Sequence, residues 1–144
     1  MTTTELDTLI RDYLALWNEP DPVARRNLIE AVWLPDAVEI LADPPEAVRK
    51  SAAELAFAAP VLTVRGHDAL ERRVRRAYEM FVEPGECVFA PDGPAQPLPA
   101  GTVAVPWAMV RRADGARQGG GLTVLAMSAD GRIAADHMFV DGSR

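Results

Sequence analysis

Four side chains of this sequence have the chemistry to move protons: Asp136, Asp43, Tyr13 and His137. Asp136 lies in the segment AADHMFV, which reads as an extended strand with Ala134 and Met138 on the same face as the carboxyl group. A carboxyl group surrounded by apolar side chains holds its proton more tightly than a free one, as a general acid or base requires. The alternative is a strand-end aspartate in solvent or paired with an arginine.

His137 and the reactive side chains outside this set have simpler explanations. His137 would be a base or a donor only if the strand register slipped by one residue; otherwise it is an interface or half-buried histidine bonded to a carbonyl. His67 precedes a predicted helix and reads as a turn residue. Cys87, the single cysteine, lies beside Val88 in a predicted strand and reads as a small buried residue. The two histidines have no metal-ligand spacing, so the sequence indicates no metal site.

Length and composition predict one globular domain. The chain has 144 residues, 49% of them apolar and 25% charged. Its net charge of −6 argues against nucleic acid or an anionic membrane as a partner. Four arginines form a local basic patch that reads as a solvated helix face: Arg72, Arg73, Arg75 and Arg76. With neither a basic leader nor an apolar run of membrane-spanning length, the sequence predicts a cytoplasmic protein.

The first half of the chain reads as helices around one strand. Apolar residues at three- and four-residue steps predict a helix over residues 6–17, and Asp21 with Pro22 starts a second helix that ends near Pro35. A strand over 36–43 and a helix over 46–57 follow. A third main helix begins after Gly66, with Asp68 and Glu71 at capping-box spacing.

The second half has the alternation of strands. Four strands are predicted, over residues 86–90, 102–112, 120–127 and 132–140. Short Asp-Gly turns between the last three predict an antiparallel meander, so the fold class is α+β with the helices on one face of a curved sheet. Pro106 predicts an edge, a bulge or a bend in its strand, and the glycines at 119–121 predict a strand opening or a bulge.

Three segments together resemble the SnoaL-like polyketide cyclases and the related ketosteroid isomerases, in the nuclear-transport-factor-2-like superfamily. In chain order these segments are Tyr13-Leu-Ala-Leu-Trp-Asn18 followed by Asp21, then Gly66-x-x-Ala-Leu70, then Trp107 through Asp114-Gly115 to Asp130-Gly-Arg-Ile133. The resemblance implies a cone-shaped antiparallel sheet with three main helices over its concave face. It also implies an apolar pocket, a homodimer through the outer face of the sheet, and proton transfer without a metal or an organic cofactor.

The resemblance carries some site residues over and not others. Tyr13 matches the isomerases' catalytic tyrosine, and Asp43 is the nearest match to their aspartate base, with a capping or turn role before Pro44 as the alternative. Tyr13 is equally well explained as a core residue with its hydroxyl at the rim. Relatives often have an aspartate where this chain has Thr123, and a threonine hydroxyl donates a hydrogen bond but does not shuttle protons near neutral pH.

The same alignment predicts which side chains line the pocket. The residues expected to contact a ligand are Trp17, Trp107, Met109, Thr123, Leu125, Met138 and, if the register slips, His137. Asp136 would also point inward, whereas Ile133, Ala135 and Phe139 would form an apolar outer face that pairs with a second copy. Glu39 shares the parity of its strand with Asp43 but reads as a solvated mid-strand residue.

Two functions agree with these observations. The first is an acid–base enzyme, a cyclase, an isomerase or an epoxide-opening enzyme, that acts on an apolar metabolite. In it Asp136 or Asp43 would carry the proton, with Tyr13 and Thr123 as hydrogen-bond donors. The second is a non-catalytic small-molecule binder or scaffold of the same fold, which Thr123 favours. The sequence does not identify the substrate.

Overall fold

The computed structural model describes residues 1–42, 50, 54–55 and 61–141. Its helical elements are α1 (Thr3–Asn18), α2 (Pro22–Val32), α4 (His67–Ala77) and a π-helical turn, η1 (Tyr78–Val82). Its strands are β1 (Trp33–Leu41), β2 (Leu62–Arg65), β3 (Cys87–Pro91), β4 (Gln96–Leu98), β5 (Thr102–Arg111), β6 (Arg117–Met127) and β7 (Ile133–Val140). The helix predicted over residues 46–57 falls almost wholly outside the described residues.

Local sequence signals explain where the helices begin. A capping box starts α1, because the Glu5 N–H donates to Thr2 Oγ1 at 3.1 Å and the Thr2 N–H donates to Glu5 Oε2 at 2.8 Å. The predicted start of α2 is confirmed: Asp21 caps it and Pro22 is its first residue. The capping box predicted for α4 is wrong. The helix starts after Gly66 without a side-chain cap, since Asp68 and Glu71 bind an arginine of α2 instead.

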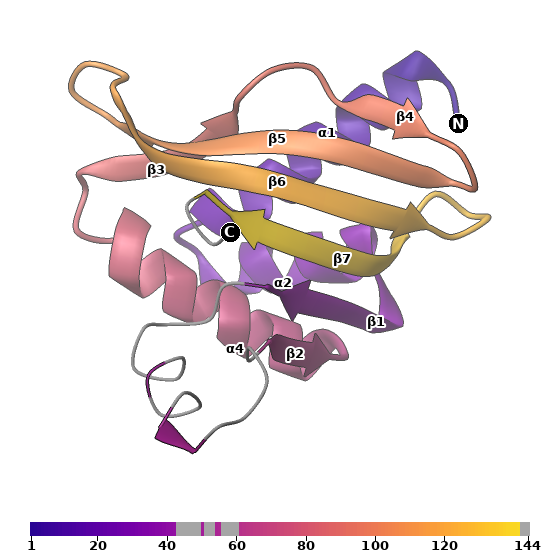
Figure 1. Ribbon diagram of the computed structural model, residues 1–144, viewed down its shortest axis with the longest axis horizontal. Helices are drawn as coiled ribbons and strands as arrows, with labels where there is room; N and C mark the ends of the chain where they lie inside the picture. Colours follow the sequence, from indigo (N-terminus) through magenta and orange to yellow (C-terminus); the bar gives the residue numbers. More distant parts are fainter. Residues whose placement is uncertain (43–49, 51–53, 56–60, 142–144) are drawn as a thin grey trace.

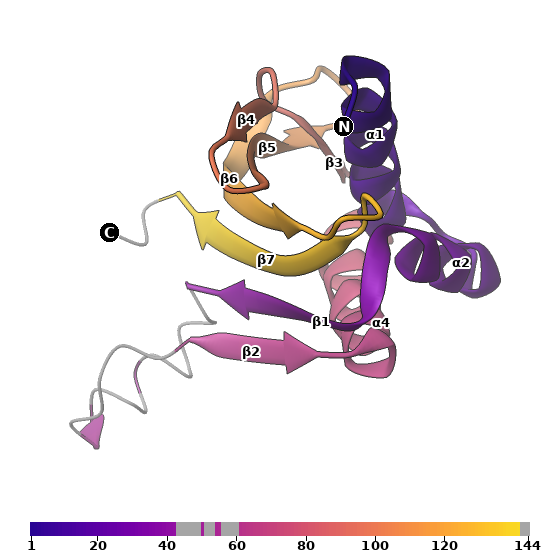
Figure 2. The same cartoon turned by 90° about the vertical axis from the view of Figure 1, so that its right-hand side faces the viewer.

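The α+β class is confirmed, with one correction to the sheet. The strands form a curved, unclosed sheet in the order β2-β1-β7-β6-β5-β3, with β4 also paired to β5 (Figure 1). Helices α1, α2 and α4 lie on one side of this sheet (Figure 2). The sheet is mixed rather than wholly antiparallel, because β7 returns between β6 and β1 and runs parallel to β1. This parallel pairing brings two strands from opposite ends of the chain side by side at the centre of the sheet.

The strands are irregular near Pro106 and near the glycine run, where the sequence predicts irregularities. Pro106 lies on β5 between the residues that pair with β3 and those that pair with β4, so its missing N–H faces a gap in the ladder. The ladder between β5 and β6 shifts register between Met109 and Val110, opposite Gln118 at the start of the glycine run. Within the described part of the chain, no helix is long and apolar enough to cross a membrane.

Candidate functional site

The strand β7 places Asp136 inside the fold. Asp136 and Met138 are buried, whereas His137 and Phe139 are exposed, as the alternation of the strand predicts. The register between β6 and β7 shifts between Ala126 and Met127. This bulge turns Ile133 to the interior, where it is fully buried, so its expected place on the outer face is wrong.

Two hydroxyl groups hold the Asp136 carboxylate. The Tyr13 hydroxyl, from α1, donates to Asp136 Oδ2 at 2.6 Å, and the Thr123 hydroxyl, from β6, donates to Oδ1. All three side chains are at most 1% exposed. Tyr13 is therefore a core residue whose hydroxyl reaches a buried carboxylate. Thr123 stands where relatives often have an aspartate. In this structure Thr123 instead contacts the carboxyl group of Asp136 on the neighbouring strand β7.

A second buried carboxyl group, which the sequence analysis placed in solvent, lies beside Asp136. Glu39 is fully buried and pairs in register with Asp136 across the parallel β1–β7 ladder. The expectation of a solvated glutamate is wrong because Glu39 shares the inner face of β1 with the buried Ala37 and Leu41. That phase is visible in the sequence, since an apolar residue stands two positions before Glu39 and another two positions after it.

Arg73, on α4, contacts both Glu39 and Trp17. Its Nε donates to Glu39 Oε1 at 3.0 Å, and its guanidinium carbon lies 5.3 Å from the centre of the Trp17 ring. Only 18% of the Arg73 side chain is exposed, so its expected place on a solvated helix face is wrong. Glu39 Oε2 has no hydrogen-bond partner in the described part of the chain.

Burial sets the protonation of this carboxyl pair. It raises the pKa of Glu39 to about 8, with the Asp136 charge adding to the rise and Arg73 opposing it. Burial also raises the pKa of Asp136, against the hydrogen bonds from Thr123 and Tyr13. The pKa of Tyr13 is well above its ordinary value because of burial and the Asp136 charge. Glu39 therefore keeps its proton near neutral pH, and the two hydroxyl donors favour the ionised form of Asp136.

Aromatic side chains border the carboxyl pair. Of the residues predicted to contact a ligand, Trp17, Trp107, Leu125 and Met138 are buried and Met109 is half-buried. Edge-on ring contacts link Tyr13 to Trp17 and Trp33, and Trp17 to Trp33 and Phe89, with centroids 5.9–6.4 Å apart. The indole N–H groups of Trp17, Trp33 and Trp107 are buried without an acceptor among the described residues. His137 points away from this cluster, and Asp43 lies outside the described residues.

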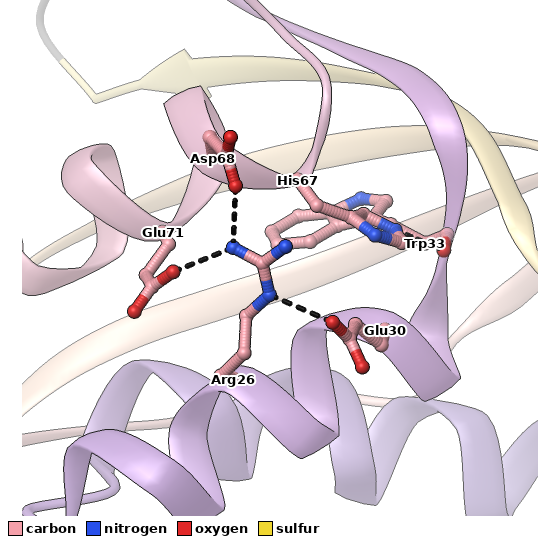
Figure 3. Close-up of polar contacts among 6 residues, drawn as sticks. All are labelled: Arg26, Glu30, Trp33, His67, Asp68 and Glu71. Atoms are coloured by element: carbon pink, nitrogen blue, oxygen red, sulfur yellow. Dashed lines mark hydrogen bonds and ion pairs between the residues drawn. The ribbon is translucent and has the colours of Figure 1, made fainter.

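An ion network fixes the helix that carries Arg73. Arg26 of α2 binds Glu30 on its own helix and both Asp68 and Glu71 on α4, at 2.6–2.9 Å (Figure 3). His67 Nε2 lies 2.8 Å from the Trp33 carbonyl oxygen, at the start of β1 (Figure 3). These contacts attach the first turn of α4 to α2 and β1, the strand that carries Glu39.

A separate cavity lies at the other end of α1. Its volume is about 890 Å³, and the first turns of α1, the start of β5 and the β6–β7 turn surround it. Its lining includes Thr4, Thr8, Leu98, Thr102, Met127 and Asp130. Neither carboxyl group of the buried pair lines it. Among the described residues, no group of three or more His, Cys, Asp or Glu side chains is placed to hold a metal ion.

Comparisons with known proteins identify the fold. No protein-family model and no curated protein matches the chain. A solved structure from Agrobacterium tumefaciens, described as a candidate isomerase of the SnoaL-like family, aligns with a TM-score of 0.73 and 22% identity, covering 97% of this chain and 100% of that one. A SnoaL-like protein of unknown function from Burkholderia thailandensis aligns with a TM-score of 0.63 and 16% identity over 99% of each chain.

A third structure has the same fold with a small molecule bound. This protein, from Catenulispora acidiphila, is described as having a ketosteroid isomerase-like fold and was solved with trimethylamine. It aligns with a TM-score of 0.56 and 14% identity, covering 90% of this chain and 82% of that one. The fold is therefore that of the SnoaL-like and nuclear-transport-factor-2-like proteins, as the sequence motifs predict.

Proposed function

We propose that this protein is an acid–base enzyme that uses Asp136 and Glu39 to move a proton on an apolar small molecule. The observation that carries the proposal is the buried pair itself, two fully buried carboxyl groups that lie in register on β1 and β7 and whose pKa values burial raises. Such a pair can accept a proton from one atom of a substrate and return a proton to another. Isomerisation, ring closure and epoxide opening all need this pair of steps.

The remaining side chains have roles that fit this chemistry. Tyr13 and Thr123 donate to Asp136 and so favour its ionised form, the form that accepts a proton. Arg73 orients the Glu39 carboxyl group through a single hydrogen bond. Because the carboxyl groups are fully buried, a substrate reaches them only after side chains move, and Arg73 is the most exposed member of the site.

The test uses 5-nitrobenzisoxazole, whose ring opening needs only a general base. The base removes the proton on the ring carbon, the electron pair forms the nitrile, and the N–O bond breaks to release a coloured 2-cyano-4-nitrophenolate. We expect the wild type to accelerate this reaction and Asp136→Asn to lose about a hundredfold of the acceleration. Asp7→Asn is the matched control, since Asp7 is exposed on α1. Equal rates for wild type and Asp136→Asn would refute the proposal.

A second candidate function is ligand binding without catalysis. It is favoured by the 890 Å³ cavity, which lies away from the carboxyl pair and has threonine hydroxyl groups on its wall. In that case the buried pair is structural. A small molecule that binds with equal affinity to wild type and Asp136→Asn, together with no acceleration of ring opening, would support this function instead.

A further inference from the structure

We infer that the ligand of this site is an anion, a carboxylic acid with an aromatic or otherwise flat apolar body, whose carboxylate binds Arg73. The inference rests on the proposed function only in placing the ligand at the same site. It begins with the hydrogen bonds that Arg73 leaves unused.

Several N–H groups of Arg73 have no oxygen acceptor among the described residues. A guanidinium group has five N–H bonds, and here only Nε donates to an oxygen, that of Glu39. Nη2 lies 4.0 Å from Met138 Sδ, a weak acceptor, and no described residue gives Nη1 a partner. With Glu39 protonated near neutral pH, the Arg73 charge is not balanced by the residue to which it is bonded. A carboxylate on the outer edge of the guanidinium group would supply both the charge and two oxygen acceptors.

Apolar rings continue from Arg73 toward the surface. The guanidinium group stacks on Trp17, whose ring centroid is 6.1 Å from that of Phe89. The Phe89 ring in turn lies 6.3 Å from Phe81 of η1 and 5.9 Å from Trp107 of β5. Phe81 is 39% exposed although it belongs to this cluster. A flat hydrocarbon body extending from Arg73 would therefore meet ring faces and edges along its length.

Unpaired buried donors support an oxygen-bearing ligand. The indole N–H groups of Trp17 and Trp107 are buried and have no acceptor among the described residues. A buried donor without a partner is costly, so an acceptor atom on a bound molecule would be favourable there. A purely hydrocarbon ligand would leave these donors, and the outer edge of Arg73, unpaired.

The charges that face Arg73 come from three elements. Glu39 on β1 is the direct partner, and Asp136 on β7, which pairs in register with Glu39, accepts a hydrogen bond from Tyr13 on α1. An anion bound to Arg73 adds negative charge beside Glu39 and so favours its protonated form. Binding of the anion should therefore take up a fraction of a proton from the solution near pH 8, where Glu39 is about half ionised.

The experiment compares 2-naphthoate with 2-naphthamide, which has the same body without the charge. Calorimetry should show at least tenfold tighter binding of naphthoate to the wild type. Repeating it in two buffers of different ionisation enthalpy should show proton uptake near pH 8. Arg73→Gln should remove the preference for naphthoate, whereas Arg72→Gln, an exposed neighbour of equal charge, should keep it.

Three other outcomes contradict the inference, and a fourth contradicts the proposed function alone. Equal binding of naphthoate and naphthamide to the wild type overturns it without the use of any variant. An equal loss in Arg72→Gln and Arg73→Gln would mean general charge attraction rather than a site. If the protein opens the ring of 5-nitrobenzisoxazole but does not prefer naphthoate, it is an enzyme that acts on neutral substrates. If the protein prefers naphthoate but does not open the ring, it binds organic acids and the proposed enzymatic function is wrong.

Discussion

Glu39 and Asp136 lie side by side with no exposure to solvent, and water therefore does not stabilise either charge. Two carboxyl groups this close do not both ionise readily, so one proton is shared between them. Two hydroxyl groups donate to Asp136 and favour its charge, whereas Arg73 is the donor to Glu39 among the described residues, and burial outweighs Arg73 in raising the pKa of Glu39 to about 8. At the scale of the residue, this asymmetry is the basis of the proposed chemistry.

The raised pKa of Glu39 makes stability depend on pH. Below about 4.5 Glu39 is protonated in both folded and unfolded chains, and its contribution to stability is complete. As the pH rises toward 8 the unfolded chain ionises while the folded chain keeps its proton, so stability falls by up to about 1.4 kcal/mol per pH unit. Urea denaturation between pH 5 and 8 should show a steeper loss for wild type than for Glu39→Gln. The exposed Glu83→Gln is the control, and parallel curves for wild type and Glu39→Gln would contradict the account.

The hydrogen bond from Tyr13 should contribute to stability near neutral pH. Tyr13→Phe keeps the ring contacts with Trp17 and Trp33 and removes one donor from an ionised, buried carboxylate. We expect a loss of about 1.5–3 kcal/mol in the free energy of unfolding. Tyr78→Phe is the control, because its hydroxyl has no hydrogen bond to a described residue while its ring contact with Arg25 remains. Equal stability of the two variants at pH 7 would argue against an ionised Asp136.

At the scale of the element, the strand β6 needs glycine where its neighbours approach most closely. A Cβ atom on Gly121 would lie 2.0 Å from the Phe139 carbonyl oxygen on β7 and 3.0 Å from the Trp107 ring on β5. Gly119, on the same strand, has nothing within 4 Å of the equivalent position. A Cβ atom on Gly120 would lie 2.6 Å from the Trp107 carbonyl oxygen, so packing requires glycine at positions 120 and 121 but not at 119.

This contrast gives a prediction with an internal control. Gly121→Ala should lower the free energy of unfolding by about 1–3 kcal/mol or more, since backbone atoms would have to move. Gly119→Ala should leave it unchanged or raise it by about 0.4–1 kcal/mol through the unfolded chain. Thermal and urea unfolding measure both. Similar effects of the two substitutions would show that β6 does not pack against β5 and β7 as described.

The elements also show what the sequence could predict about the site. Helix starts and strand alternation were readable from local signals, and so was the burial of Asp136 on β7. The pairing of Glu39 with Asp136 was not, because it depends on a parallel contact between β1 and β7, and local turns specify only the antiparallel meander. Arg73 was misplaced for a related reason: a charge pattern on a helix does not show that a buried carboxyl group faces one of its arginines.

At the scale of the whole molecule, the outer face of the sheet bears an apolar patch. Leu122 and Phe139 are cross-strand neighbours on β6 and β7 and are 38% and 44% exposed. We expect this face to pair with a second copy, so light scattering at tens of micromolar should give the mass of a dimer. Phe139→Glu should give a monomer, whereas Val23→Glu, an exposed position on α2, should not. A wild-type monomer at that concentration would contradict this prediction.

The most direct test of the account is the titration of the carboxyl pair itself. Carbon-detected NMR of protein labelled at its glutamate and aspartate carboxyl carbons follows each group from pH 3 to 10. We predict one glutamate that titrates near pH 8 and disappears in Glu39→Gln, and an aspartate whose titration shifts in that variant because the two groups interact. If every glutamate and aspartate of the wild type titrates independently at its ordinary pKa, the pair shares no proton and the proposed acid–base site does not exist.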